Sequence, residues 1–197
     1  MNTPQPPNRP TILFVGTSLT AGLGLQPDQA FPALIEHIAD SVGTPITAVN
    51  AGVSGETTAG ALQRIDWVLK TPATILVLET GANDALRGLP VEAAKANIEA
   101  IIDRIKQTQP NTRIVLVQIE APPNLGAAYD KAFHTMYPAI AQAKGATLIP
   151  FLLDSVYGRP QLNQDDGVHP NAEGERIVAS NVWRGLQPIL QSLPKTH

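Results

Sequence analysis

The chain has 197 residues, of which 43% are hydrophobic and 16% are charged, and it contains no cysteine. This length fits one domain with its own hydrophobic core, and the missing thiols exclude cysteine nucleophiles, cysteine-ligated zinc and iron–sulfur clusters. The net charge is −3, and only 14 lysines and arginines are spread along the chain. This composition excludes the basic surface that nucleic-acid binding requires.

The first ten residues, MNTPQPPNRP, are polar and include four prolines. We expect a flexible N-terminal arm over residues 1–10 and a single domain over residues 11–193. The arm lacks the apolar segment of a signal peptide, which leaves open whether one was removed. The apolar runs further along are of strand length, far below the roughly 20 residues that span a bilayer, so we expect no integral membrane association.

Short apolar runs alternate with longer stretches in which apolar residues recur at helical spacing. The predicted strands are residues 11–15, 46–50, 74–79, 113–119 and 147–151. The predicted helices are residues 31–42, 62–69, 91–105, 129–140 and about 172–186, the last with Asn171 as N-cap and Pro188 as its stop. Near-continuous apolar strands that alternate with helices predict an α/β fold whose parallel sheet is covered on both faces.

Ser18 is the first candidate for chemistry, because it follows the first predicted strand directly in Gly16-Thr17-Ser18-Leu19. In an open parallel sheet, ligands bind beyond the carboxyl ends of the strands, where the Ser18 hydroxyl would emerge. The other serines fall in helix ends, a loop or the tail, where capping or solvation explains them. Ser18 also fits an ordinary helix cap, so the choice between the two roles depends on the other loops at this edge.

His169 differs from the other histidines, two of which fall inside predicted helices while another ends the chain. It lies in the loop before the last helix, three residues after Asp166. A neutral histidine that acts as a base needs a partner on its other ring nitrogen, and Asp166 is placed to provide it, whereas Asp165 is expected to point away. Residues of these types also form ordinary turns, so this motif alone does not establish catalysis.

Two further loops offer hydrogen-bond donors at the same edge of the sheet. Gly55 follows the second predicted strand, and Asn83 follows the third in Gly81-Ala82-Asn83-Asp84. A glycine at the start of a helix can expose its N–H, and an asparagine side chain supplies an amide donor. Together with the Ser18 N–H, these groups would stabilise the oxyanion that forms during ester hydrolysis.

These four loops resemble the sequence blocks of the SGNH, or GDSL-type, hydrolase superfamily, which is named for its serine, glycine, asparagine and histidine. The matching segments are residues 16–19, 50–56, 81–84 and 166–170. Over nearly the whole chain after the arm, the sequence is similar to bacterial thioesterase I/arylesterase/lysophospholipase L1-type enzymes. One departure is Thr17, which stands where the superfamily's usual aspartate precedes the serine.

The resemblance implies a flavodoxin-like, three-layer α/β/α sandwich with a five-stranded parallel sheet in the order 2-1-3-4-5. It implies hydrolysis through an acyl-enzyme, with no metal and no cofactor. Ser18, Asp166 and His169 would form the catalytic triad, and the Ser18 N–H, Gly55 and Asn83 would form the oxyanion hole. It also implies a periplasmic or secreted enzyme, although the given chain shows no signal peptide and the cytoplasm stays open.

Residues 84–90 and 121–126 are expected to form the walls of an acyl pocket. Their glycines and small residues favour shallow walls, which suit short- to medium-chain acyl esters and thioesters. We expect such a small substrate as the partner, no nucleic acid, and a monomer or weak homo-oligomer. The residues assigned to the pocket are Thr17, Leu19, Asp84, Leu86, Arg87, Ala121, Pro122 and Val168.

Other functions remain open from the sequence. A carbohydrate O-deacetylase of the same superfamily would share the whole catalytic set, although Tyr157 is the main loop aromatic available for stacking on a sugar. A non-catalytic binding protein with a vestigial site would also keep these residues. A nucleotide-binding module is disfavoured, because the chain contains neither G-x-G-x-x-G nor G-x-x-x-x-G-K-[ST].

Overall fold

The computed structural model describes residues 9–194, so most of the predicted arm over residues 1–10 lies outside the described residues. Within residues 9–194, five parallel strands form one sheet in the order β2-β1-β3-β4-β5, which confirms the predicted topology. The strands are β1 (Thr11–Gly16), β2 (Thr47–Gly52), β3 (Ile75–Glu79), β4 (Arg113–Val117) and β5 (Thr147–Ile149). The fourth and fifth strands each end two residues earlier than predicted, at Val117 and Ile149.

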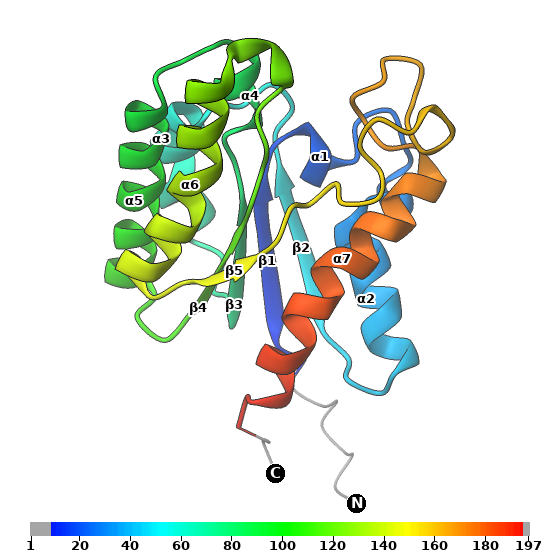
Figure 1. The fold of residues 1–197 in the computed structure, drawn as a ribbon. Helices are drawn as coiled ribbons and strands as arrows, with labels where there is room; N and C mark the ends of the chain where they lie inside the picture. The colour runs from blue at the N-terminus through cyan, green and yellow to red at the C-terminus, as the bar shows by residue number, and fades with distance from the viewer. Residues whose placement is uncertain (1–8, 195–197) are drawn as a thin grey trace, which may run out of the picture.

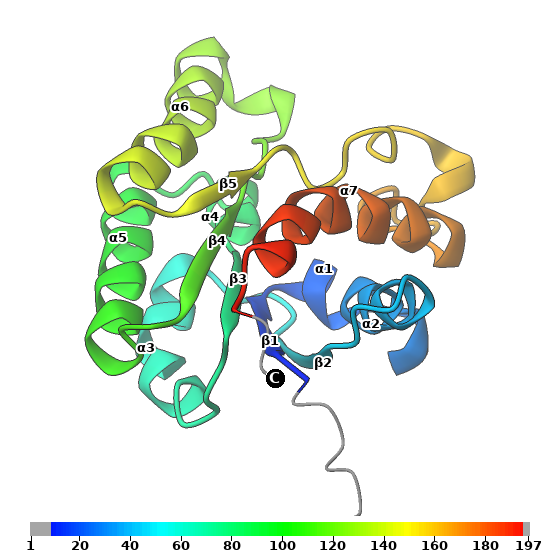
Figure 2. The same cartoon turned by 90° about the horizontal axis from the view of Figure 1, so that it is seen from below.

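Helices cover both faces of the sheet and complete the predicted three-layer α/β/α sandwich (Figure 1). On one face α2 (Phe31–Ser41) packs against α7 (Ala172–Gln191), and on the other α5 (Val91–Thr108) packs between α3 (Thr58–Val68) and α6 (Ala127–Lys144). Figure 2 shows the two groups of helices on opposite sides of the sheet. Among residues 9–194, we find no helix with the length and apolar character needed to cross a membrane.

Short helical segments that the sequence did not predict lie in the loops. They are α1 (Ser18–Ala21), α4 (Ala82–Leu86) and the 3-10 helices η1 (Pro27–Gln29), η2 (Pro123–Leu125) and η3 (Pro160–Leu162). Segments of three to five residues are too short for a hydrophobic period to show in the sequence. Both α1 and α4 lie at the edge where the strands end, the upper edge in Figure 1.

Two neighbouring interior strands, β1 and β3, change from apolar to polar residues where they reach this upper edge. Residues 75–78 of β3 are apolar and no more than 1% exposed, and the next residue, Glu79, is a carboxylic acid that is 0% exposed. In β1 the buried apolar run ends at Gly16, and the buried Thr17 follows it. The core therefore ends in a layer of buried polar groups, directly beneath the loops that carry the candidate site.

The last helix begins as predicted and ends later than predicted. Asn171 caps α7, because its side-chain oxygen accepts hydrogen bonds from the N–H groups of Glu173 and Gly174. Pro188 was expected to stop the helix, but α7 continues through it to Gln191, so this prediction was wrong. Within the last turn a proline removes a single intrahelical hydrogen bond, and continuing the helix buries Ile189 against the core.

Candidate active site

Ser18 is the first residue of α1, so its position follows directly from the end of β1. Its side-chain oxygen lies 2.8 Å from Nε2 of His169, although 151 positions separate the two residues in the chain. The fold therefore brings together the predicted nucleophile and base, from the loops after β1 and before α7. Ser18 is 9% exposed, which places it at the boundary between the core and the surface.

Asp166 contacts the other side of the histidine ring. Its Oδ2 lies 2.7 Å from Nδ1 of His169, and its Oδ1 accepts hydrogen bonds from the N–H groups of His169 at 3.0 Å and Val168 at 2.9 Å. These hydrogen bonds lower the pKa of Asp166 to about 2. The backbone N–H of His169 has the largest effect, the His169 ring the next largest, and the N–H of Val168 a smaller one. Asp166 is therefore ionised near neutral pH, so Nδ1 carries the ring proton and Nε2 faces the serine as an acceptor.

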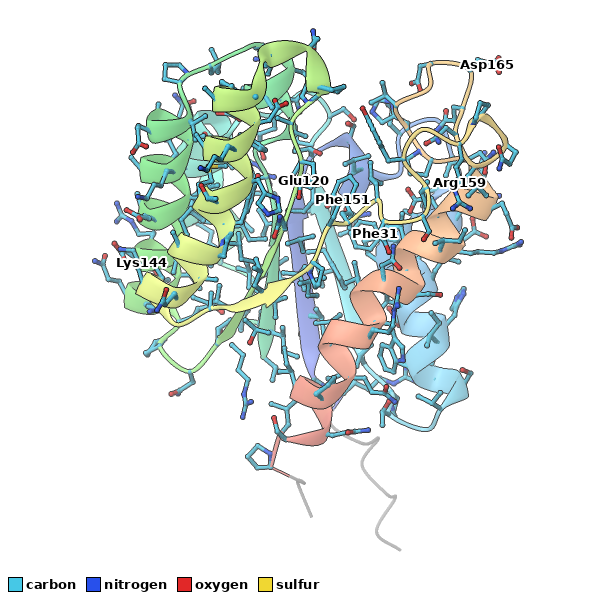
Figure 3. The ribbon with its side chains drawn as sticks, viewed as in Figure 1. Phe31, Glu120, Lys144, Phe151, Arg159 and Asp165 are labelled. Atoms are coloured by element: carbon cyan, nitrogen blue, oxygen red, sulfur yellow. The ribbon has the colours of Figure 1, made fainter. Side chains whose placement is uncertain are left out.

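Asp165, the neighbouring carboxylate, takes no part in this arrangement. Its side chain is exposed, and Figure 3 shows it at the outer tip of the loop. The positions of the two acids agree with the expectation from the sequence that Asp166 turns towards the ring and Asp165 turns away.

Gln164, which the sequence did not single out, holds the loop that carries the acid and the base. Its backbone N–H donates to the carbonyl of His169 at 2.8 Å. Its side-chain Nε2 donates to the carbonyl of Pro170 at 2.9 Å and to that of Leu23, in the loop after α1, at 2.7 Å. A β-bridge between Asn163 and Pro170 closes the base of the loop. Gln164 thus joins this loop to the loop that follows the serine.

The two other predicted donors belong to loops that contact each other. Gly55 has φ of +78°, a left-handed conformation that favours glycine. Asn83, in α4, donates from Nδ2 to the carbonyl of Glu56 at 2.9 Å, and Arg87 donates from Nη2 to the carbonyl of Gly55 at 2.9 Å. The Glu56 carboxylate is itself bound by Arg64, with 2.7 Å between Nη2 and Oε2. Three side chains, Asn83, Arg87 and Arg64, therefore hold the loop after β2 in place by hydrogen bonds.

A buried carboxyl group, Glu79, lies beneath the serine. Its Oε2 accepts hydrogen bonds from the backbone N–H of Thr17 at 2.8 Å, the hydroxyl of Thr20 at 2.8 Å and the hydroxyl of Thr17 at 3.0 Å. Burial raises the pKa of the Glu79 carboxyl, and the hydrogen bonds from Thr17 and Thr20 oppose that effect. The sequence contains one signal for this group, a single acid at the end of an otherwise apolar strand.

The residues predicted to line the acyl pocket fall into two groups. The buried group is Thr17, Leu19 and Asp84, which are 1%, 6% and 2% exposed. The Asp84 carboxylate accepts the hydroxyl hydrogen bond of Thr58 at 2.6 Å, so it faces α3. These three side chains are therefore packed largely inside the protein. The residues at least partly accessible are Leu86, Arg87, Ala121, Pro122 and Val168.

Large exposed hydrophobic side chains gather at the edge of the sheet that carries Ser18. Among residues 9–194 there are eight of them, and two, Val42 and Trp67, lie elsewhere. The others follow the carboxyl ends of the strands: Leu23, Val53, Leu86, Leu89, Tyr157 and Val168. We call these six residues the apolar collar. This is the edge at which open parallel sheets bind their ligands.

Other chemistry-bearing groups lie apart from the serine. Nδ1 of His134 is 2.8 Å from Oε1 of Glu120, which follows β4. Two shallow hollows at the opposite edge of the sheet are lined by residues that include Gln109 and Lys106, and neither has a serine or histidine in the described part of its lining. Within residues 9–194, we find no cluster of three histidine or acidic side chains that could bind a metal ion.

The chain is similar to known hydrolases over most of its length. The model of the GDSL-like Lipase/Acylhydrolase family matches residues 14–177. Thioesterase 1/protease 1/lysophospholipase L1 of Escherichia coli (strain K12) is 36% identical over 182 residues, which cover 91% of this chain and 85% of that protein. Arylesterase of Vibrio mimicus is 35% identical over 177 residues, which cover 89% and 87%. The crystal structure of the psychrotrophic esterase EstA from Pseudoalteromonas sp. has a TM-score of 0.86 at 32% identity and covers 92% of this chain and 99% of that one.

Proposed function

The chain belongs to the GDSL-like lipase/acylhydrolase family, and from that premise we propose how its residues carry out the reaction. The assignment confirms the resemblance to SGNH hydrolases that four segments of the sequence predicted. Relatives at 36% and 35% identity are named as a thioesterase, a lysophospholipase and an arylesterase. The chain is accordingly an ester hydrolase, and the roles of its residues and its choice of substrate are our proposal.

The contact between His169 and Ser18 carries the proposed mechanism. With 2.8 Å between Nε2 and Oγ, His169 takes the hydroxyl proton as Ser18 attacks the acyl carbon. The ionised Asp166 holds the ring and stabilises the imidazolium that results. The imidazolium then protonates the leaving alcohol or thiol, which leaves the acyl group on Ser18. Water, deprotonated by His169, attacks this acyl-enzyme and releases the acid, and the proton returns to the Ser18 oxygen.

The tetrahedral intermediates of both steps carry a negative oxygen that needs preorganised donors. We assign this role to the backbone N–H groups of Ser18 and Gly55 and to the side-chain amide of Asn83. The hydrogen bond from Asn83 to Glu56 supports the assignment, because it uses one amide hydrogen and leaves the second for the substrate. The same contact ties the asparagine to the loop that carries Gly55.

The apolar collar supports a hydrophobic acyl group on the substrate. Its members are between 36% and 57% exposed, and they follow the carboxyl ends of the strands, at the edge of the sheet that also carries Ser18. An open surface provides contact area for a short or medium acyl chain but does not enclose a long one, so we propose esters and thioesters of short- to medium-chain acids as substrates. The collar offers a single aromatic ring, Tyr157, which gives little support for stacking on a carbohydrate.

Hydrolysis of p-nitrophenyl esters from acetate to palmitate tests both parts of the proposal. Ser18→Ala is expected to abolish hydrolysis and labelling by a fluorophosphonate, while Ser180→Ala, on the exposed face of α7, keeps both. A Ser18→Ala protein with the wild-type rate would disprove the assignment of the nucleophile. A maximum at palmitate would contradict the proposed chain length, and faster release of acetate from an acetylated sugar than from the aryl ester would favour the deacetylase.

A further inference from the structure

We propose that Glu79 is a positioning residue for the nucleophile, and that its buried carboxyl group, acting through Thr17 and Thr20, fixes the turn that presents Ser18 to His169. This inference rests on the proposed role of Ser18. None of the three residues touches the substrate in the mechanism above, so each acts only through the geometry of the serine.

The hydrogen bonds of Glu79 reach the chain on both sides of Ser18. Two come from Thr17, just before the serine, through its N–H at 2.8 Å and its hydroxyl at 3.0 Å. The third comes from the hydroxyl of Thr20, after the serine, at 2.8 Å. The helix that contains Ser18 is only four residues long, and a helix of that length has little stability of its own. Its orientation therefore depends on contacts with the rest of the fold, and Glu79 supplies three of them.

Glu79 lies in the middle strand of the sheet. It ends β3, a strand that pairs with β1 on one side and β4 on the other, and it is 0% exposed. A buried carboxyl group is costly unless hydrogen bonds compensate, and here every donor comes from the turn around Ser18. The carboxyl group thus ties the turn to the centre of the sheet.

Gly16 shows how closely this turn is packed around the carboxyl group. A Cβ atom at residue 16 would lie 2.6 Å from Oε2 of Glu79 and 2.0 Å from the hydroxyl of Thr20. Neither distance is compatible with a side chain, so the strand must end in glycine for the threonines to reach Glu79. The close approach leaves little room for Ser18 to shift relative to the sheet.

Thr17 is suited to a carboxyl partner because a hydroxyl both donates and accepts. It donates to Glu79, and as the N-cap of α1 it accepts from the N–H of Leu19 at 3.4 Å. An ionised aspartate at this position would accept from Leu19 but could not donate to Glu79. This explains how the chain accommodates a threonine where its superfamily usually has an aspartate.

Thr17→Val and Thr17→Ser separate positioning from stability. Valine removes the hydroxyl at nearly constant volume, whereas serine keeps it. A 1 Å misplacement of a catalytic group costs up to about 10²-fold in rate. We expect Thr17→Val to shift the Ser18 hydroxyl by less than this, so kcat should fall about 10-fold while KM stays within about twofold of the wild-type value. Inactivation by a fluorophosphonate should slow by the same factor as kcat, and Thr17→Ser should recover most of both rates.

Thr112→Val is the matched control, because it removes a threonine hydroxyl that donates to the carbonyl of Ala73 at 2.6 Å, at the opposite edge of the sheet. It should lower the melting temperature without changing kcat. If Thr17→Val, like this control, lowers the melting temperature and leaves kcat unchanged, the contact to Glu79 is only structural and the proposal is wrong.

If Thr17→Val does not fold, Thr20→Val, which removes the other hydroxyl that donates to Glu79, provides the same comparison. Ser18→Ala tests the proposed function separately, since an active Ser18→Ala protein would overturn the nucleophile and not merely its positioning.

Discussion

Glu175 gives the fold a dependence on pH that can be measured without any substrate. It lies in the first turn of α7, is 1% exposed, and accepts a hydrogen bond from the N–H of Phe31, the first residue of α2, at 2.7 Å. The N-cap of α2, Ala30, has no side-chain oxygen, so Glu175 caps this helix from another element. Burial raises the pKa of Glu175 to about 8, the bond from Phe31 opposes the rise, and the nearby Glu79 adds to it.

The magnitude follows from linkage between protonation and folding. In the unfolded chain Glu175 ionises with a pKa of 4.5, and in the folded protein it keeps its proton until the pH approaches about 8. The folded-state pKa is the higher of the two, so the stabilisation is complete below the unfolded pKa and is lost as the pH rises through the folded one. Each pH unit between them costs about 1.4 kcal/mol, so between pH 5 and pH 8 the free energy of unfolding should fall by roughly 3 to 4 kcal/mol on account of this group.

Glu175→Gln isolates this effect, because glutamine keeps an oxygen for the N–H of Phe31 and does not titrate. The free energy of unfolding, from urea denaturation at pH 5, 6, 7 and 8, should be similar for variant and wild type at pH 5. By pH 8 the variant should be the more stable by roughly 3 to 4 kcal/mol. Glu173→Gln, on the exposed side of the same helix turn, is the control and should follow the wild type.

Parallel pH dependences of wild type and Glu175→Gln would refute this reasoning, since they would mean that Glu175 has the same pKa in the folded and unfolded states. Asp166 does not interfere, because its pKa of about 2 places its titration below this pH range.

Two further substitutions test the catalytic geometry. Asn83→Ala removes a proposed oxyanion donor and should lower kcat by about 10² to 10³ with little change in KM, so an unchanged kcat would remove Asn83 from the oxyanion hole. Gln164→Leu removes the donor to the carbonyls of Leu23 and Pro170, and kcat and the rate of fluorophosphonate inactivation should both fall about 10-fold, because the histidine loop loses its link to the serine loop. Inactivation at the wild-type rate would show that the link is dispensable.

The strands and the main helices could be predicted because their signal is local. Each strand is a short apolar run, and its burial on both faces of the sheet is what makes the run apolar. The order of the strands is not a local property, and it came from the family resemblance. The misplaced end of α7 has a physical reason too, because Pro188 sits in the last turn, where the helix tolerates it.

The candidate site could be predicted because parallel strands bring the loops at their carboxyl ends to one edge. Ser18 and His169 meet there, as loop positions alone suggested. The supporting residues could not be found in this way. Glu79 acts on a residue 62 positions away, and Gln164 on one 141 positions away, so neither partner shows in the local sequence.

The exposure of the residues assigned to the pocket could not be predicted, because it depends on the direction of each side chain. Thr17, Leu19 and Asp84 are neighbours in sequence of proposed catalytic residues, but in and next to the short helices α1 and α4 adjacent side chains point in different directions. Adjacent residues of a helix lie on different faces, so a neighbour of a catalytic residue readily turns into the core. The sequence therefore indicates the loops but not which of their side chains face inwards.

The closed loop between Asn163 and Pro170 has a consequence for protein engineering. The loop contains both the acid and the base, and it closes on itself through a β-bridge and the hydrogen bonds of Gln164. Its link to the serine loop ends on the carbonyl of Leu23, a backbone atom that any residue at that position provides. The loop is thus a transferable cassette. Chimaeras of related esterases that cross over at its bridge should inherit the acid and base as a matched pair, provided that the serine side keeps Gly24, where a Cβ atom would clash with the side chain of Gln164.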